Sequence, residues 1–532
     1  MVINISSKKN IGLPVGMLNK EDDKMYGLVK FTDWEAKKET QFSKISYYYK
    51  NERIEESELK KYIDINKIDN VKDILLIDDT KKNYIIEKPK LNLYEDLVSI
   101  IIPEGKEGIG HSVFEHCKNL ISVTMPESMT NIGECAFNDC INLTNITFSS
   151  NIENIEIKTF AACTKLENII LPKKVKNIKN KAFQYCKSLR KIEIPAATTN
   201  IEECVFSDCD NLESIIVDEK NPVYDNRNNC NAIIETKTNT LIQGCKNTII
   251  PNDITAIGQC AFSGCIGLTS IKIPEKINSI GKAAFIKCEN LTTIEIPKNV
   301  TIIENAVFSQ CFNLENVKMY EGITKIGEYA FGACKKIKNI KIPKNVINIG
   351  EGAFQYCENL INITLSENIT DIEMYTFQNC LALTSITIPN SVINICSQAF
   401  EGCKNLKEII FGNKLTSIGY CAFSYCPNLT NIETPQSVSY IESSAFAECT
   451  GLKSVTIPKS VKSIKPYTFE NCTELTDVII KDGVTSIENG AFCNCNNLTN
   501  IIIPESVTKI EKHAFYGCTK LTNIKIPKNV KK

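Results

Sequence analysis

The chain has 532 residues, of which 43% are hydrophobic and 23% charged, so wholesale disorder is excluded and a sizeable core can form. The formal net charge of -1 gives no reason to expect nucleic acid or an acidic membrane surface as a partner. Only three histidines are present, which leaves imidazole acid–base chemistry poorly supplied. We therefore expect a scaffold or binding protein without a cofactor rather than an enzyme.

The two ends of the chain carry no recognisable targeting or anchoring signal. The first residues lack an uninterrupted apolar stretch after a basic start, so no signal peptide is predicted. No run of about 18 apolar residues occurs, and the C-terminus has neither a hydrophobic tail nor a lipidation motif. These features predict a cytoplasmic protein that does not insert into a membrane.

Residues 1–90 differ in composition from the rest of the chain, because they carry charge clusters and contain no cysteine. We predict that they form an N-terminal cap or a small separate domain. Within them, Val29-Lys30-Phe31 resembles the V-x-F docking peptide of regulators of protein phosphatase 1, although the basic residues that usually precede it are absent. So short a triplet also arises by chance, and that is the alternative interpretation.

Residues 91–532 repeat a unit of 23 residues. Counted from a recurring phenylalanine, the unit has Cys at +3, Leu (once Ile) at +6, mostly Ile or Val at +9, an apolar residue at +11 and usually Pro at +12. Leu91 begins an incomplete copy, and Ile68, Val71, Ile74 and Ile77 fit the 0, +3, +6, +9 spacing more loosely. The recurring residues are Phe114, Phe137, Phe160, Phe183, Phe206, Phe262, Phe285, Phe308, Phe331, Phe354, Phe377, Phe400, Phe423, Phe446, Phe469, Phe492 and Phe515.

This spacing predicts a short strand and a helical turn in each unit. The residues at -1, 0, +3 and +6 share one side of a helical or 3₁₀ turn, whereas the apolar residues at +9 and +11 alternate as in a strand. Proline at +12 ends that strand because it has no amide donor. A single unit buries too little apolar surface to offset the entropy of ordering it, so the units must stack into a solenoid.

The regular spacing is interrupted once, where Phe206 and Phe262 lie 56 residues apart. We assign residues 218–248 to an insertion. Its asparagine-rich turn sequence, followed by residues 232–236 and 240–243, predicts a hairpin. A structural hairpin that replaces one irregular repeat is favoured over a projecting binding loop.

All 25 cysteines lie between Cys117 and Cys518, and 17 of them occupy the +3 offset. We expect this cysteine ladder to pack as small apolar side chains, because one cysteine per unit does not provide a clustered zinc site and parallel side chains are poorly placed for a disulfide. His111, His116 and Cys117 could supply three metal ligands, but their spacing fits no known rule. We therefore predict no metal site, and no nucleophile or nucleotide motif marks a catalytic residue.

The motif LxxIxIPxxVxxIxxxAFxxC resembles the repeat of the BspA-like leucine-rich repeat proteins. The resemblance implies an α/β repeat fold: a right-handed leucine-rich repeat solenoid with a curved parallel sheet and short helical or 3₁₀ turns. It also implies a binding function, often as a surface antigen or adhesin. The cell surface is therefore an alternative to the cytoplasmic location.

In such a solenoid the offsets +8 and +10 point outward from the concave face of the sheet. The residues at +10, here called the +10 row, are mixed in charge and suit a protein surface or an extended polymer better than a small molecule. Solvated strand faces without a partner are the alternative. Ile410, Ile479 and Ile502 in this row could form an apolar contact site. We predict a partner-binding patch at Lys272, Glu295, Lys318, Lys341, Thr364 and Thr387.

The functional hypothesis is a non-enzymatic scaffold that binds a protein, or an extended polymer, through this face and its loops. One alternative is a surface antigen or adhesin exported without a recognisable signal peptide. Another is an effector domain in residues 1–90 that is targeted by the solenoid.

Overall fold

The computed structural model describes residues 98–102 and 104–530, together with five short strands in the preceding part of the chain. These five are β1 (Val2–Asn4), β2 (Tyr47–Tyr49), β3 (Glu52–Ile54), β4 (Ile74–Ile77) and β5 (Tyr84–Ile86). The chain forms two compact units, one comprising Met1–Ile249 with Ala261–Gly267 and the other Ile250–Cys260 with Leu268–Lys532. Val29 and Phe31 lie outside the described residues.

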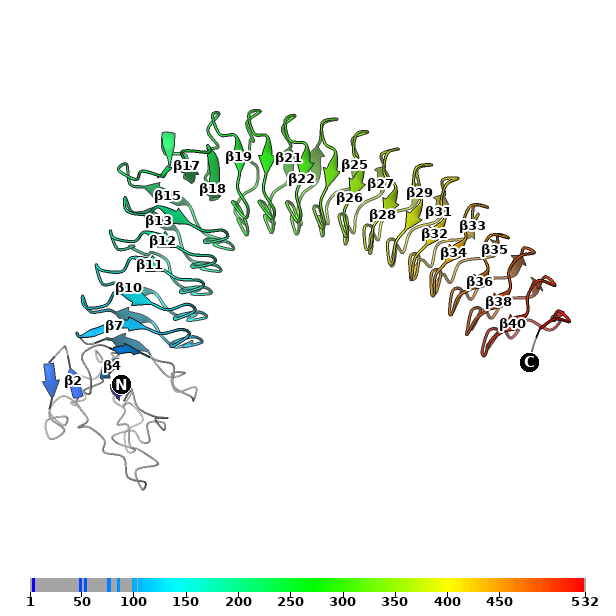
Figure 1. Cartoon of the computed structure of the whole chain (residues 1–532), viewed down its shortest axis with the longest axis horizontal. Helices are drawn as coiled ribbons and strands as arrows, with labels where there is room; N and C mark the ends of the chain where they lie inside the picture. The colour runs from blue at the N-terminus through cyan, green and yellow to red at the C-terminus, as the bar shows by residue number, and fades with distance from the viewer. Residues whose placement is uncertain are drawn as a thin grey trace, which may run out of the picture. The chain divides into compact units, whose positions relative to one another are not determined.

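Each regular coil of the first unit contributes up to two short parallel strands, one near offset +9 and one at offsets +17 and +18. Figure 1 shows these strands stacked side by side. The first set is β6 (Ser99–Ile101), β8 (Ser122–Thr124), β10 (Asn145–Thr147), β13 (Lys191–Ile194) and β15 (Ser214–Val217). The second set is β7 (Lys106–Ile109), β9 (Asn131–Ile132), β11 (Asn154–Ile155), β12 (Asn177–Ile178) and β14 (Asn200–Ile201).

The second unit repeats this arrangement over more coils. Its first set is β21 (Thr293–Glu295), β23 (Asn316–Lys318), β25 (Asn339–Lys341), β27 (Asn362–Thr364), β29 (Ser385–Thr387), β31 (Glu408–Ile410), β33 (Asn431–Ile432), β35 (Ser454–Ile457), β37 (Asp477–Ile480) and β39 (Asn500–Ile502). Its second set is β19 (Ala256–Ile257), β20 (Ser279–Ile280), β22 (Ile302–Ile303), β24 (Lys325–Ile326), β26 (Asn348–Ile349), β28 (Asp371–Ile372), β30 (Asn394–Ile395), β32 (Ser417–Ile418), β34 (Tyr440–Ile441), β36 (Ser463–Ile464), β38 (Ser486–Ile487) and β40 (Lys509–Ile510).

Neighbouring strands pair in parallel with a register of one repeat, so equivalent residues lie side by side. Ile294 of β21 pairs with Val317 of β23, for example, and Ile340 of β25 with Ile363 of β27. The strand near +9 was expected from the sequence. The second strand was not, because its only signal was a single recurring isoleucine at +18.

Strand pairing continues upstream of the first complete repeat. Strand β1 pairs with β4, β4 pairs with β6, and β5 pairs with β7. Ile74 lies opposite Ile100, which holds the +9 offset of the Leu91 copy. Ile74 rather than Ile77 therefore occupies +9 in the loose upstream copy, and the phase suggested by spacing alone was wrong there.

The helical turn expected around each phenylalanine consists of two consecutive hydrogen bonds, each from a backbone N–H to the carbonyl three residues earlier. In one such turn Cys403 N donates to Phe400 O at 3.2 Å and Leu406 N donates to Cys403 O at 3.0 Å. The turn does not grow into a helix because the residues at -2 and +2 are left-handed, with φ of 55° at Gln398 and 71° at Gly402. Within the described residues, the one 3₁₀ helix is η2 (Arg227–Asn229).

The core of each unit is built from the recurring phenylalanines and the cysteine ladder. Phenylalanine rings of successive coils stack with centroids 5.0 to 5.7 Å apart. Thiols of the ladder donate to the carbonyl of the phenylalanine in the preceding coil, as Cys403 Sγ does to Phe377 O at 3.1 Å. Most ladder cysteines are buried free thiols, as expected, whereas Cys204 and Cys260, at offset -2, are disulfide-bonded.

The insertion forms the predicted hairpin within the first unit. Strands β16 (Tyr224–Asp225), β17 (Ala232–Glu235) and β18 (Thr240–Gly244) pair antiparallel in that order. The buried Tyr224 hydroxyl accepts a hydrogen bond from Ile201 N at 3.0 Å, so a side chain satisfies the edge of β14 where the regular ladder stops. Arg227 binds both carboxylate oxygens of Asp225 and also Asn239. These contacts agree with a structural role for the hairpin.

Candidate functional site

The predicted patch lies on one outward face of the second unit. All six residues are exposed: Lys272, Glu295, Lys318, Lys341, Thr364 and Thr387. The residue before each of them in its strand points inward, as Ile294 does in β21 and Ile340 in β25. Glu295 pairs in register with Lys318, and Lys341 with Thr364. Ser270 pairs with Thr293, which aligns Lys272 with the same row. Within each of these strand pairs the row residues therefore lie side by side.

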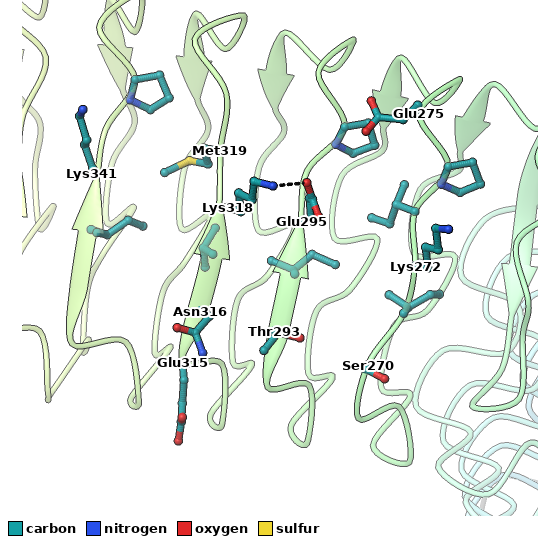
Figure 2. Close-up of a pocket in the computed structure, with 18 of the residues that line it drawn as sticks. Ser270, Lys272, Glu275, Thr293, Glu295, Glu315, Asn316, Lys318, Met319 and Lys341 are labelled. Carbon is teal, nitrogen blue, oxygen red and sulfur yellow. Dashed lines mark hydrogen bonds and ion pairs between the residues drawn. The ribbon is translucent and has the colours of Figure 1, made fainter.

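Four of the six residues line a groove of about 1130 Å³ that crosses successive coils. Lys272, Glu295, Lys318 and Lys341 run through its middle, as Figure 2 shows. Thr364 and Thr387 are not among its lining residues. Prolines at offset +12 line one side of the groove. Small polar side chains at offset +8 line the opposite side. These lining residues are Pro274, Pro297 and Pro343 on one side and Ser270, Thr293, Asn316 and Asn339 on the other.

Glu295 and Lys318, which line the groove, belong to a charge cluster around the Tyr320 side chain. Glu295 accepts an ion-pair hydrogen bond from Lys318 Nζ at 2.6 Å and a second hydrogen bond from the Tyr320 hydroxyl. The Nζ atoms of Lys298 and Lys318 lie 5.3 and 5.1 Å from the centroid of the Tyr320 ring. Tyr320 was not predicted from the sequence, although it occupies the +12 offset where proline is usual, and that exception was the available signal.

These contacts hold the cluster in its ionised form. The hydrogen bond from Lys318, followed by that from Tyr320, lowers the pKa of Glu295. The hydrogen bond to Glu295 raises the pKa of Lys318 above its ordinary value. A carboxylate and an ammonium group stabilised in this way are poorly suited to exchanging protons near neutral pH.

Lys272 and Lys341, the first and last row residues of the groove, differ from Lys318 in forming no ion pair with any described residue. Within the part of the chain that the structure describes, neither Lys272 nor Lys341 forms a side-chain hydrogen bond or an ion pair. Both are exposed and line the groove. Along the part of the +10 row that lines the groove, one ion pair thus lies between two lysines that form none.

The other candidate positions do not assemble into sites. His111 and His116 are exposed and face Glu134 and Asp139, whereas Cys117 is buried, so the three do not converge. Across residues 98–102 and 104–530, no group of three histidine, cysteine or acidic side chains could hold a metal ion. In the same described part, no helix has the length and apolar character needed to cross a membrane.

The outward isoleucines of the second unit are exposed, and two of them are neighbours. Ile479 of β37 pairs in register with Ile502 of β39, while Ile410 lies on β31. Their role as a contact site stays a prediction.

The sequence matches the family model of the BspA type leucine rich repeat region over residues 89–213, 242–360, 324–453 and 416–532. The chain belongs to this family. The recognition made from the repeat motif is therefore confirmed, and the stacked parallel strands confirm the leucine-rich repeat solenoid.

Solved leucine-rich repeat structures resemble this member of the BspA type. A leucine-rich repeat protein from Bacteroides ovatus has 24% identity and a TM-score of 0.43, with 70% of this chain and 82% of that chain covered. One from Eubacterium ventriosum has 22% identity and a TM-score of 0.45, with 70% and 88% covered. A leucine rich cell surface protein from Faecalibacterium prausnitzii has 24% identity and a TM-score of 0.40, with 71% and 83% covered. No curated protein matches the chain significantly.

Proposed function

We propose that this BspA-type repeat protein is a non-enzymatic scaffold and that the groove along the +10 row holds a segment of a partner protein. The observation that carries the proposal is the groove itself, which spans successive coils and is lined by exposed residues of the row. Parallel strands in register hold these side chains about 4.8 Å apart along the solenoid. A ligand that lies across the strands can therefore make many small contacts in series.

The chemistry of the groove suits a polypeptide. The prolines along one edge offer apolar surface, and the exposed amides of Asn316 and Asn339 offer donors and acceptors for a peptide backbone. The charged pair of Glu295 and Lys318 is held in place by its own ion pair and by the hydrogen bond from Tyr320. These features favour recognition over catalysis.

A comparison of two alanine blocks in the same coils tests the proposal. The first block removes the row side chains that line the groove, and the second removes side chains on or directly before strands of the other set. Proteins bound from a lysate of the source cells are quantified by mass spectrometry for each immobilised variant. We expect partners to be lost with the first block and retained with the second, and retention with both would refute the groove as the binding site. The blocks are Lys272, Glu295, Lys318 and Lys341 against Ser279, Thr301, Lys325 and Asn348.

The cellular location and the role of residues 1–90 stay predictions. Antibody staining of intact and permeabilised source cells distinguishes the two locations, and we expect signal after permeabilisation only. Signal on intact cells would favour the surface-antigen or adhesin interpretation instead. Docking to protein phosphatase 1 is tested by binding of the full chain to that enzyme before and after Val29→Ala and Phe31→Ala, with loss of binding expected if the peptide is used.

A further inference from the structure

The positive charge of the +10 row is not balanced within the row. Three lysines and one glutamate occupy its positions along the groove. Glu295 already accepts hydrogen bonds from Lys318 and Tyr320. The next position after Lys341 is the neutral Thr364. Lys272 and Lys341 therefore remain as two unpaired cations at the two ends of the part of the row that lines the groove.

The acidic residues of the groove other than Glu295 lie toward its edges. Figure 2 places Glu275 at one edge and Glu315 at the opposite edge, with the row between them. At the first edge Glu275 and Glu321 alternate along the coils with Lys298 and Lys344, and Glu321 accepts a hydrogen bond from the backbone of Lys344 at 2.7 Å. The lining as a whole holds four lysines and four glutamates, so the excess of positive charge is confined to the row in the middle of the groove.

Resting on the function proposed above, we propose that the ligand is an acidic polypeptide segment that lies across the strands in an extended conformation and places one carboxylate on Lys272 and another on Lys341. The two lysines are three strand spacings apart, or about 14 Å at about 4.8 Å per spacing. An extended peptide advances about 3.3 Å per residue, so acidic side chains about four positions apart span this distance. The side chains between them pass over the Glu295–Lys318 pair and contact the prolines at the edge.

An isolated pair of acidic residues fits this groove better than a uniformly anionic polymer does. A polymer with a negative charge on every unit would meet Glu295 at the centre of the row and Glu275 at the edge. Like charges placed opposite one another disfavour binding. A peptide can present neutral or apolar residues at those points and carboxylates only at the ends.

The test begins with selection of short random peptides displayed on phage against the immobilised full-length chain. The peptides that are enriched are then synthesised with a fluorescent label, and their binding is measured by anisotropy. We expect them to carry pairs of Asp or Glu three to five positions apart, and to bind more weakly as salt increases. Enriched peptides without this acidic pattern, or an absence of salt dependence in the wild-type protein, would overturn the proposal.

Charge reversal of the two end lysines provides the decisive comparison. The variant K272E/K341E should weaken binding of the selected peptides at least about tenfold. The matched control K325E/K336E changes the net charge equally at exposed positions outside the groove, and it should change binding less than about twofold. Equal effects of the two variants would refute the assignment of the carboxylates to Lys272 and Lys341.

A third variant separates failure of this inference from failure of the proposed function. Asn316→Trp places a bulky side chain in the groove at an exposed position. Peptides that lose binding to Asn316→Trp but not to K272E/K341E would show that the groove binds peptides of another kind, so that the function stands and the acidic ligand does not. Failure to enrich any peptide, or binding that is unaffected by Asn316→Trp, would count against both.

Discussion

The buried thiols of the cysteine ladder should make this solenoid sensitive to alkali, and Cys403 provides the sharpest test. Its side chain is fully buried, and its thiol donates to Phe377 O at 3.1 Å. Burial raises the pKa of Cys403 from 9.0 to about 12 because the thiolate loses its hydration inside the core. Ionisation of this group is therefore much easier in the unfolded chain than in the folded one.

The direction of the pH effect follows from that difference. A folded pKa above the unfolded value means that the contribution of the thiol to stability is fully present below pH 9.0 and is lost as the pH rises toward about 12. Over this interval each pH unit lowers the free energy of unfolding by about 1.4 kcal/mol for one thiol. At about pH 10.5 the loss for Cys403 is about 2 kcal/mol.

Cys403→Ser removes the titrating group and retains a hydrogen-bond donor. Near pH 7 we expect the variant to be less stable than the wild type by about 1–2 kcal/mol, because a hydroxyl is buried in place of a thiol. By about pH 10.5 the wild type has lost about 2 kcal/mol that the variant cannot lose, so the difference should close or reverse. Cys357 and Cys449, whose pKa values burial likewise raises to about 12, should behave in the same way.

Urea unfolding followed by circular dichroism at several pH values measures this difference. Ile386→Val is the control, because it removes a buried methylene from β29 and introduces no titrating group. Its destabilisation of about 0.5–1.5 kcal/mol should not change with pH. A Cys403→Ser difference as independent of pH as that of Ile386→Val would refute the reasoning.

Three further predictions concern the turns, the charge cluster and thiol reactivity. Gly352→Ala should destabilise the chain in urea by about 1–2 kcal/mol, since Gly352 has a φ of 57° and a Cβ there would lie 2.3 Å from the Tyr329 ring; Tyr329→Ala should recover part of the loss. Glu295→Gln should leave the urea midpoint unchanged, because its partner Lys318 is 60% exposed, and a clear destabilisation would contradict a purely surface role. Iodoacetamide should modify the partly exposed Cys135 in the native protein before any fully buried ladder thiol, as checked by peptide mass spectrometry.

Much of the candidate site could be predicted from the sequence because position in the repeat determines exposure. The +10 offset alternates with inward-facing residues, so Lys272, Glu295, Lys318 and Lys341 had to share one outward face. Their order along the solenoid followed from their order in the chain. The existence of the groove could not be predicted, and neither could the absence of Thr364 from its lining. Both depend on the sizes and directions of neighbouring side chains.

The pairing of charges within the row is a clear case of what spacing leaves open. Glu295 has a lysine on either side, Lys272 and Lys318, each one repeat away. Only the structure shows that Lys318 is the partner, because Tyr320 in the same coil also donates to Glu295 and orients it. By spacing alone, Lys272 and Lys318 are equivalent candidates for the partner of Glu295. In the structure, Lys318 forms the ion pair and Tyr320 of the same coil donates to the same carboxylate.

The sequence alone determined the period, the stacking, the buried phenylalanines and cysteines, and the family. A strict repeat places each offset in the same environment in every coil, so a recurring residue type reveals that environment directly. Tertiary structure decided the second strand set, the left-handed residues that keep each turn from becoming a helix, the use of Tyr224 to close the ladder at β14, and the charge pairing in the groove. These features depend on contacts between residues one repeat or more apart, and on side-chain directions that no local pattern encodes.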